Sequence, residues 1–343
     1  MNVRATVLIP TYGEAHFAKW AIKSVQQQTV QELEICIICD GSPQHMVEFF
    51  NEIAEMDSRI RVYSYPKSPR TGEPYRDEVI RQTTGSIICY CAHDDLWLPN
   101  YIETVEKELH TYSMVNSMQA IINVPKKAES EKSLLSFVYF IDLKDNEEKM
   151  RMINEVYSMG LSFTAHSRNA YIHLVEGWVT TPETDIPTDL YMWRKFLNDE
   201  RTICKTILKI IALNFRKPDR VNWSEEEKDQ ELEFYFLKLH DMEFIKFIGE
   251  YPVQYFYNQV KTLQDWIGVA DERLEDILGK QRQIDLLNLQ LNAQNDTINQ
   301  LIPQTSLKRQ IILRIKRLLP KPILKQMVKI KRLFFGPVGI DHL

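Results

Sequence analysis

The chain has 343 residues, of which 44% are apolar and 26% are charged, a composition typical of soluble globular proteins. This length allows one large core or two smaller ones, and we expect one main domain with appendages. No apolar run approaches the roughly 18 to 20 residues that a membrane-spanning helix needs. The opening MNVRATVLIP also lacks the basic, apolar and small-residue parts of a secretory signal. These features argue against a membrane-spanning or secreted protein and predict a cytoplasmic one.

The net charge of −5 is unevenly distributed. Residues 305–343 carry ten Lys or Arg and a single acid, Asp341, whereas the rest of the chain carries 32 bases and 46 acids. A basic segment on an acidic body is typical of a local binding signal. A nucleic-acid-binding surface would spread basic residues over a domain, so we expect no nucleic acid partner.

Five cysteines form an odd set without the spacing of a disulfide scaffold, which favours a reducing compartment. Cys36-x-x-Cys39 and Cys89-x-Cys91 could be interpreted as a zinc site. Both pairs, however, lie in apolar strands, where residues three apart point to opposite faces. Buried free thiols are the favoured interpretation, and it includes Cys204.

Strands and helices alternate over the first hundred residues. This alternation predicts right-handed crossovers and a doubly wound, mostly parallel sheet in an α/β fold, flanked by helices. Further strands near 120–124, 134–141 and 161–166 are expected to continue the sheet, giving one domain over residues 1–220 with halves 1–110 and 111–220. The first elements are expected as strand 3–10, helix 15–28, strand 33–39, helix 43–56, strand 60–65, helix 73–84 and strand 86–92.

The sequence after Pro218 is helical in character. Residues 221–258 are expected to form a helical closing segment, followed by a coiled-coil-like helix over 259–302. Apolar residues recur there at seven-residue intervals, which favours self-association; a long helix packed on its own domain is the alternative. These residues are Leu263, Ala270, Ile277, Ile284, Leu291 and Ile298.

The final segment, residues 303–343, divides at Pro320 and Pro322 into two short helices with apolar stripes flanked by Lys and Arg. Such helices can lie in the headgroup region of a membrane, where each base contributes on the order of 1 kcal/mol. The pattern predicts peripheral contact with the inner face of the cell membrane. Packing on the body or on a partner is the alternative.

Polar side chains cluster where the first strands end. Pro10, Thr11, Tyr12 and Glu14 follow the first strand and would form a seat for a nucleotide base, and Asp40 follows the second strand, placed to accept a base N–H. The fourth strand runs into two further acids, Asp94 and Asp95. Two carboxylates at this edge predict a divalent cation, Mg²⁺ or Mn²⁺, and with it a phosphate-bearing substrate.

Ordered motifs over residues 3 to about 110 resemble glycosyltransferase family 2, whose members have the GT-A fold. The family's V-x-I-P-T-Y-N strand is similar to residues 7–13, VLIPTYG, and its S-V-x-x-Q-T to residues 24–29. Its D-D-G-S is similar to CDGS at 39–42. Its A-R-N helix and G-x-x-I strand resemble YRD at 75–77 and GSII at 85–88. Its D-S-D-D-x-W-x-P resembles AHDDLWLP at 92–99.

The resemblance implies roles for these positions. Thr11, Tyr12 and Glu14 would line the nucleoside pocket and Asp40 would contact the base. Arg76 would approach the diphosphate, and Asp94 with Asp95 would hold the metal and the ribose. The chain departs from the family pattern at three positions, with Gly13 for Asn, Cys39 for the first Asp of D-D-G-S, and Ala92 for the first carboxylate of Asp-x-Asp.

The acceptor side is expected over residues 160 to 195. The family begins a helix there with a Glu-Asp pair followed four residues later by Trp, and Asp189 and Trp193 keep that spacing. The resemblance implies that Asp189 is the general base, with a helix-opening acid as the alternative and Asp185 as a second candidate. His166 and Trp178 could face the acceptor or belong to the core.

These features predict a metal-dependent, inverting glycosyltransferase in surface polysaccharide synthesis. The donor would be a UDP-, GDP- or dTDP-linked sugar and the acceptor a saccharide or lipid-linked hydroxyl. One rival hypothesis is a non-catalytic scaffold that oligomerises through its C-terminal helices. Another is a nucleotidyltransferase, which would need a glycine-rich phosphate loop after the first strand, where the chain has only Gly13.

Overall fold

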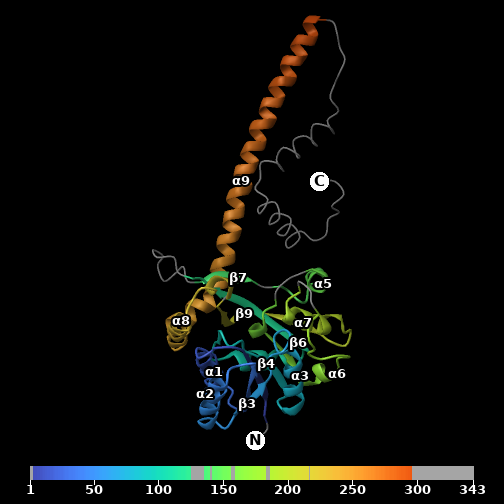
Figure 1. Cartoon of the computed structure of the whole chain (residues 1–343). Helices are drawn as coiled ribbons and strands as arrows, with labels where there is room; N and C mark the ends of the chain where they lie inside the picture. Colours follow the sequence, from blue (N-terminus) through green and yellow to red (C-terminus); the bar gives the residue numbers. More distant parts are fainter. Residues whose placement is uncertain are drawn as a thin grey trace. The chain divides into compact units, whose positions relative to one another are not determined.

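The computed structural model describes residues 3–124, 135–139, 141–155, 159–182, 186–215 and 217–295, with the side chains at 135–139, 217–218 and 284–295 not described. The chain consists of two compact units, Met1–Pro252 and Val253–Leu343 (Figure 1). The expected closing segment, residues 221–258, therefore falls mostly within the first unit. The basic tail, residues 303–343, lies outside the described residues.

The elements follow the expected alternation. The strands are β1 (Ala5–Thr11), β2 (Leu33–Asp40), β3 (Ile60–Tyr65), β4 (Ile87–Tyr90), β5 (Asp95–Trp97), β6 (Met114–Ile122), β7 (Leu135–Tyr139), β8 (Thr164–Ser167) and β9 (Cys204–Asn214). The helices are α1 (Ala18–Gln26), α2 (Gln44–Glu55), α3 (Glu73–Gln82), α4 (Tyr101–Leu109), α5 (Asn146–Asn154), α6 (Arg168–His173), α7 (Thr188–Asn198), α8 (Glu225–Lys238) and α9 (Met242–Asn295), with 3-10 turns η2 (Leu161–Phe163) and η3 (Lys217–Arg220).

The sheet of the first unit has nine strands in the order β3-β2-β1-β4-β8-β6-β9-β5, with β7 beside β6. The first four strands are mutually parallel, and β6 and β9 are parallel to each other. β8 enters antiparallel between β4 and β6, while β5 and β7 are antiparallel to their neighbours. The α/β class with a mostly parallel sheet, flanking helices and a C-terminal helical extension is confirmed.

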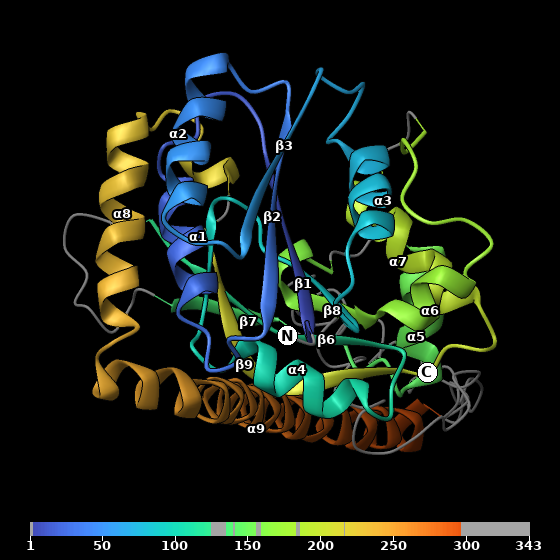
Figure 2. The same ribbon diagram turned by 90° about the horizontal axis from the view of Figure 1, so that it is seen from below.

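Burial on both faces explains why the central strands are apolar. Every residue of β2, LEICIICD, is buried, as expected for a parallel strand covered by helices on both sides. Figure 2 shows α1, α2 and α8 to one side of these strands and α3, α6 and α7 to the other. On α1, the buried positions include Ala18, Ala21, Ile22 and Val25, which share one helical face.

Helix α8 is tied to α1 by polar contacts at its edge. Ser224 caps α8 in a capping box with Glu227, which satisfies two backbone N–H groups at the helix start. Farther along, Asp229 accepts hydrogen bonds from Lys19 (3.0 Å) and from the Trp20 indole (2.9 Å). The helix that follows Pro218 therefore packs on the first half of the domain.

In the second unit, the described residues continue helix α9 to Asn295. The expected seam residues Leu263, Ala270 and Ile277 lie on this helix, as do Ile284 and Leu291, while Ile298 lies outside the described residues. Nothing in one chain tests self-association, which stays a prediction. Within the described residues, no helix combines the length and apolar character needed to cross a bilayer.

Candidate active site

Strands β1, β2 and β4 are parallel and end at the same edge of the sheet, which brings their following residues together. Gly13 and Gly41, which follow β1 and β2, have φ values of 59° and 72°. This left-handed conformation is easy for glycine and is the one that asparagine tolerates best among other residues. Gly13 can therefore replace the family's asparagine without altering the turn.

The residues after β1 line a partly open surface. Thr11 is buried, whereas the Tyr12 side chain is 47% exposed. The Tyr12 ring meets the His93 ring edge-on, with centroids 5.3 Å apart, and His93 Nδ1 lies 3.0 Å from the Pro10 carbonyl oxygen. Glu14 lies 2.9 Å from His45 Nε2. The expected nucleoside-binding side chains thus lie beside the turn that carries the acidic pair.

Asp40 is buried at the end of β2 and holds the loop that follows β3. Its carboxylate accepts hydrogen bonds from the Ser68 backbone N–H (2.6 Å), the Ser68 hydroxyl (3.1 Å) and Lys67 Nζ (2.5 Å). Gly72 packs against it, since a Cβ at that position would lie 3.2 Å from Asp40 Cβ. A carboxylate has about four acceptor sites, so the role expected for Asp40 leaves room for one base N–H.

Arg76 is almost fully buried beneath this loop. Its guanidinium lies over the Trp178 ring, 4.7 Å from the centroid, and Nη2 donates to the Thr71 carbonyl oxygen at 2.7 Å. Burial lowers the pKa of Arg76, and the charge of Glu73 is the largest opposing influence. Arginine remains protonated even so. The charges of Asp40 and Asp189 also raise the pKa of this cation, so each of the two carboxylates lies near Arg76.

The acidic pair divides at the start of β5. Asp95 is 3% exposed and accepts from the Ser162 hydroxyl (2.6 Å), the Asn214 amide (2.9 Å) and the Phe215 N–H (3.3 Å). Burial raises the pKa of Asp95, as does the neighbouring charge of Asp94. Asp94 is only partly buried. Three of the roughly four acceptor sites of the Asp95 carboxylate are thus engaged inside the protein, and the expectation that both carboxylates hold a metal stays a prediction.

Asp189 lies in the first turn of α7. Burial raises the pKa of Asp189, while the Leu190 N–H, which donates to it at 2.9 Å, and the charge of Arg76 act in the opposite direction. A carboxylate with a raised pKa is a better proton acceptor at neutral pH. The second candidate base, Asp185, lies outside the described residues.

The two remaining acceptor-side candidates belong to the aromatic core. His166 is fully buried, with Nε2 2.7 Å from the Tyr90 hydroxyl and Nδ1 3.1 Å from the Ser167 carbonyl oxygen. Burial lowers the pKa of His166 to about 3. Trp178 is also buried and donates to the Tyr90 hydroxyl at 2.9 Å. This packing favours the core alternative for both rings, and their place on the acceptor side stays a prediction.

The cysteines are free and buried, as the favoured interpretation predicts. Burial raises the pKa of Cys36 to about 12, so this thiol is a poor metal ligand at neutral pH. Across the ranges that the structure describes, no three His, Cys, Asp or Glu residues are grouped as a metal site. A cation would therefore depend on few protein ligands.

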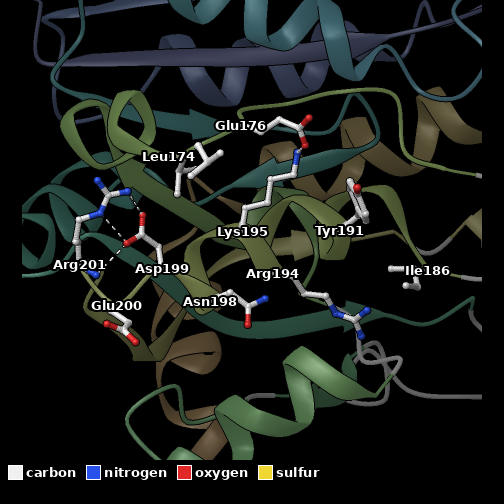
Figure 3. A pocket seen from close by; sticks show the side chains of 11 residues that line it. Leu174, Glu176, Ile186, Tyr191, Arg194, Lys195, Asn198, Asp199, Glu200 and Arg201 are labelled. Atoms are coloured by element: carbon white, nitrogen blue, oxygen red, sulfur yellow. Dashed lines mark hydrogen bonds and ion pairs between the residues drawn. The ribbon is translucent and has the colours of Figure 1, made fainter.

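A groove of about 790 Å³ lies on another face of α7 (Figure 3). Its basic side chains are already engaged: Lys195 pairs with Glu176 at 2.7 Å, Arg201 pairs with Asp199 at 2.5 Å, and Arg194 donates to the Met152 carbonyl oxygen at 2.9 Å. Asp189 does not line this groove. We assign no ligand to this groove.

Several residues that organise the site carry no recognisable motif. Ser162 and Asn214 hold Asp95, and Lys67 and Ser68 hold Asp40, from positions far away in the sequence. Single polar residues of this kind belong to no repeating sequence pattern, so their contacts with Asp95 and Asp40 cannot be predicted from the sequence. For Glu73 the sequence offers only a weak indication: an acid followed by a proline is typical of the first turn of a helix, which predicts its position but not its contacts.

Comparison with known proteins gives the family. The model of glycosyl transferase family 2 matches residues 6–168. The glycosyltransferase GlyA of Streptococcus pneumoniae serotype 4 is 27% identical over 110 residues, which is 32% of this chain and 15% of that protein. The chondroitin synthase of Pasteurella multocida is 28% identical over 103 residues, 30% of this chain and 10% of that protein. The matches thus span only a small part of these longer relatives.

Among solved structures, the TarS protein of S. aureus, residues 1–349 in complex with UDP, is similar with a TM-score of 0.47 and 15% identity. The similarity covers 69% of this chain and 71% of that one. The family match includes β1, β2 and β4 with the site residues at their ends, and it extends through β8. Residues 6–168 of this chain therefore form a glycosyl transferase family 2 domain.

Proposed function

We propose that this protein is a metal-dependent glycosyltransferase that moves a sugar from a nucleotide-sugar to a hydroxyl of a saccharide or lipid-linked acceptor, with inversion at the anomeric carbon. The observation that carries the proposal is that the loop at Thr71 and Gly72 joins residues from both halves of the domain. Thr71 accepts from Arg76 and its hydroxyl lies 3.2 Å from that of Thr188, next to Asp189, while Gly72 packs against Asp40. A carboxylate for the nucleotide base, a cation for the diphosphate and a partly buried general base are the groups that such a transfer needs.

Each residue has a separate task in this proposal. Tyr12 and Asp40 bind the base, with the aromatic ring exposed and the carboxylate fixed by Ser68 and Lys67. The buried cation of Arg76 faces the charge of the diphosphate. Asp189 removes the proton from the acceptor hydroxyl as that oxygen attacks the anomeric carbon from the side opposite the leaving group.

The residues present fit a divalent cation held by one protein carboxylate. Mg²⁺ commonly binds one or two carboxylates together with substrate phosphates. We assign the cation to Asp94, because Asp95 is engaged by Ser162, Asn214 and Phe215. A bound Mg²⁺ or Mn²⁺ would neutralise charge on the departing nucleoside diphosphate. The metal ligand that we propose is therefore Asp94 alone.

The acceptor class follows from the relatives and from the tail. Relatives named as polysaccharide synthases support a role in the synthesis of a surface polysaccharide. The basic segment at residues 305–343 would hold the enzyme beside lipid-linked acceptors through anionic headgroups. This membrane contact and the oligomer through residues 259–302 are proposals that rest on the sequence patterns.

The test begins with binding. Thermal unfolding of the full chain is followed with UDP, GDP or dTDP, with and without Mn²⁺, because a ligand of the native state raises its stability. One nucleotide should raise the melting temperature, and Asp94→Ala should remove the Mn²⁺-dependent part of that shift. If no nucleotide shifts the wild-type protein with Mn²⁺, the proposal is wrong.

Turnover is tested with the sugar form of the nucleotide that binds. Release of the nucleoside diphosphate should need Asp189, so Asp189→Asn should lose turnover by at least about 100-fold while it still binds nucleotide. Glu52→Gln, which removes an exposed charge from α2, is the control. Equal turnover by Asp189→Asn and wild type would show that another group is the base.

A further inference from the structure

Glu73 is the buried contact between two loops that belong to different halves of the domain. We call residues 66–72, which follow β3, the donor loop, and residues 178–182, which follow α6, the acceptor loop. Glu73 opens α3 and is 0% exposed. One carboxylate oxygen accepts the Thr71 N–H of the donor loop at 2.9 Å, and the other accepts the Thr181 N–H of the acceptor loop at 3.2 Å.

The same two loops hold Arg76. Thr71 in the donor loop accepts from Arg76 Nη2 through its carbonyl oxygen at 2.7 Å. Trp178 in the acceptor loop supplies the ring on which the guanidinium lies. Within the described residues, the buried Nε of Arg76 has no acceptor. The direction of this cation therefore depends on how the two loops are placed relative to each other.

Two exposed contacts join the same regions. Arg70 donates to the Pro182 carbonyl oxygen at 3.1 Å, and the Thr71 and Thr188 hydroxyls lie 3.2 Å apart. Water competes for exposed hydrogen bonds, so the buried carboxylate of Glu73 is the stronger connection. Thr188 directly precedes Asp189, so a shift of the donor loop would also reach the proposed base.

We propose that Glu73 is a positioning residue that joins the donor loop to the acceptor loop and thereby orients Arg76 toward a nucleoside diphosphate. The inference rests on the proposed function for the identity of this ligand. For the affinity of Glu73 variants for an anionic ligand, a positioning role predicts the opposite of what charge alone predicts. Removing a carboxylate near an anion site should strengthen anion binding by charge alone, whereas loss of the positioning contact should weaken it.

The experiment compares Glu73→Gln and Glu73→Asp with wild type. Gln keeps the size but loses the charge, and it can offer an oxygen to only one of the two N–H groups. Asp keeps the charge but is one methylene shorter, so it cannot reach both. The control is Glu78→Gln, which removes an exposed charge from the same helix. A role in charge alone predicts that Asp preserves wild-type behaviour, and positioning predicts that it does not.

The first measurement is hydrogen exchange of the full chain without nucleotide. Loss of a charge-assisted hydrogen bond should speed exchange of the amides at residues 178–181 by roughly 10- to 100-fold in both Glu73 variants. Glu78→Gln should match wild type. Unchanged exchange in the Glu73 variants would overturn the proposal.

The second measurement is the dissociation constant for UDP, GDP or dTDP with Mn²⁺. Both Glu73 variants should bind about tenfold more weakly than wild type and Glu78→Gln. Tighter binding by Glu73→Gln, or wild-type binding by Glu73→Asp, would overturn the inference. If wild type binds none of the three nucleotides, the proposed function fails, and the joining of the loops is still decided by hydrogen exchange.

A third measurement needs no variant and decides the matter if the Glu73 substitutions do not fold. Exchange at residues 178–181 of wild type is compared with and without the nucleotide that binds. If Arg76 is placed by both loops, its ligand should slow exchange in the acceptor loop. Unchanged exchange there at saturating nucleotide would refute the coupling.

Discussion

Replacing Asp95 should damage the fold, and replacing Asp94 should damage metal-dependent binding. Asp95→Ala leaves three donors without their acceptor: the hydroxyl of Ser162, the amide of Asn214 and the N–H of Phe215. Each buried, unsatisfied group costs about 1–3 kcal/mol. With partial relaxation, we expect a loss of about 3–6 kcal/mol in the free energy of unfolding.

For a unit of this size, 1 kcal/mol corresponds to about 2–4 °C in melting temperature. Asp95→Ala should therefore lower the melting temperature by about 6–24 °C, with or without Mn²⁺. Asp95→Asn, which retains one acceptor oxygen, should lose less. Asp94→Ala should change the melting temperature of the free protein by only a few degrees, because its side chain is partly exposed.

The assay is thermal unfolding followed by circular dichroism, repeated with the nucleotide that binds and Mn²⁺. We expect Asp95→Ala to lower the melting temperature of the free protein, and Asp94→Ala to remove the Mn²⁺-dependent rise in melting temperature. If Asp95→Ala melted like wild type and lost only the Mn²⁺-dependent shift, Asp95 would be a metal ligand and our assignment would be refuted.

The remaining predictions concern His166, Trp178, the heptad seam and the basic tail. Because the pKa of His166 falls to about 3 in the folded protein from about 6.5 in unfolded chains, its contribution to stability should be lost as pH falls below 6.5; urea unfolding at pH 7 and pH 5 should show a smaller pH dependence in His166→Gln. Trp178→Leu should lower stability by about 2–4 kcal/mol in urea unfolding and weaken nucleotide binding, whereas loss of stability alone would show that its contact with Arg76 does not contribute to nucleotide binding. Ile277→Lys should abolish any self-association seen by light scattering, and Glu272→Lys, an exposed position on the same helix, should not. A chain ending at residue 303 should sediment less with anionic vesicles than the full chain, and equal sedimentation would rule out the tail as the membrane contact.

The first half of the fold could be predicted because its signals are local. Apolar runs such as β2, with a turn signal at Asp40-Gly41, mark parallel strands regardless of what lies beside them. The order of the strands in the second half has no such signal. The antiparallel insertion of β8 between β4 and β6 depends on contacts between distant segments. The strand expected at 120–124 is only the end of β6, which begins at Met114.

Candidate site residues could be found from sequence where the chemistry is concentrated in a motif. Asp40, Arg76 and Asp189 were expected from their motifs, and the structure brings each of the two carboxylates near Arg76. The roles of His166 and Trp178 could not be decided from the sequence. The residue type and the surrounding apolar pattern are the same whether such a ring contacts a substrate or packs against Tyr90. Packing against Tyr90 favours the core alternative for both residues.

The division of the acidic pair has a physical origin in the strand that it opens. Asp94 lies in the turn that precedes β5, whereas Asp95 opens β5 opposite Asn214 of β9. Asp95 is buried and accepts hydrogen bonds from Ser162 and Asn214, whereas Asp94 is only partly buried. With Ala92 in place of the family's first carboxylate, Asp94 is the acidic side chain of this motif to which we assign the cation. A cation held by one carboxylate needs the oxygens of the diphosphate to complete its coordination, so metal and nucleotide should bind this protein together rather than in succession.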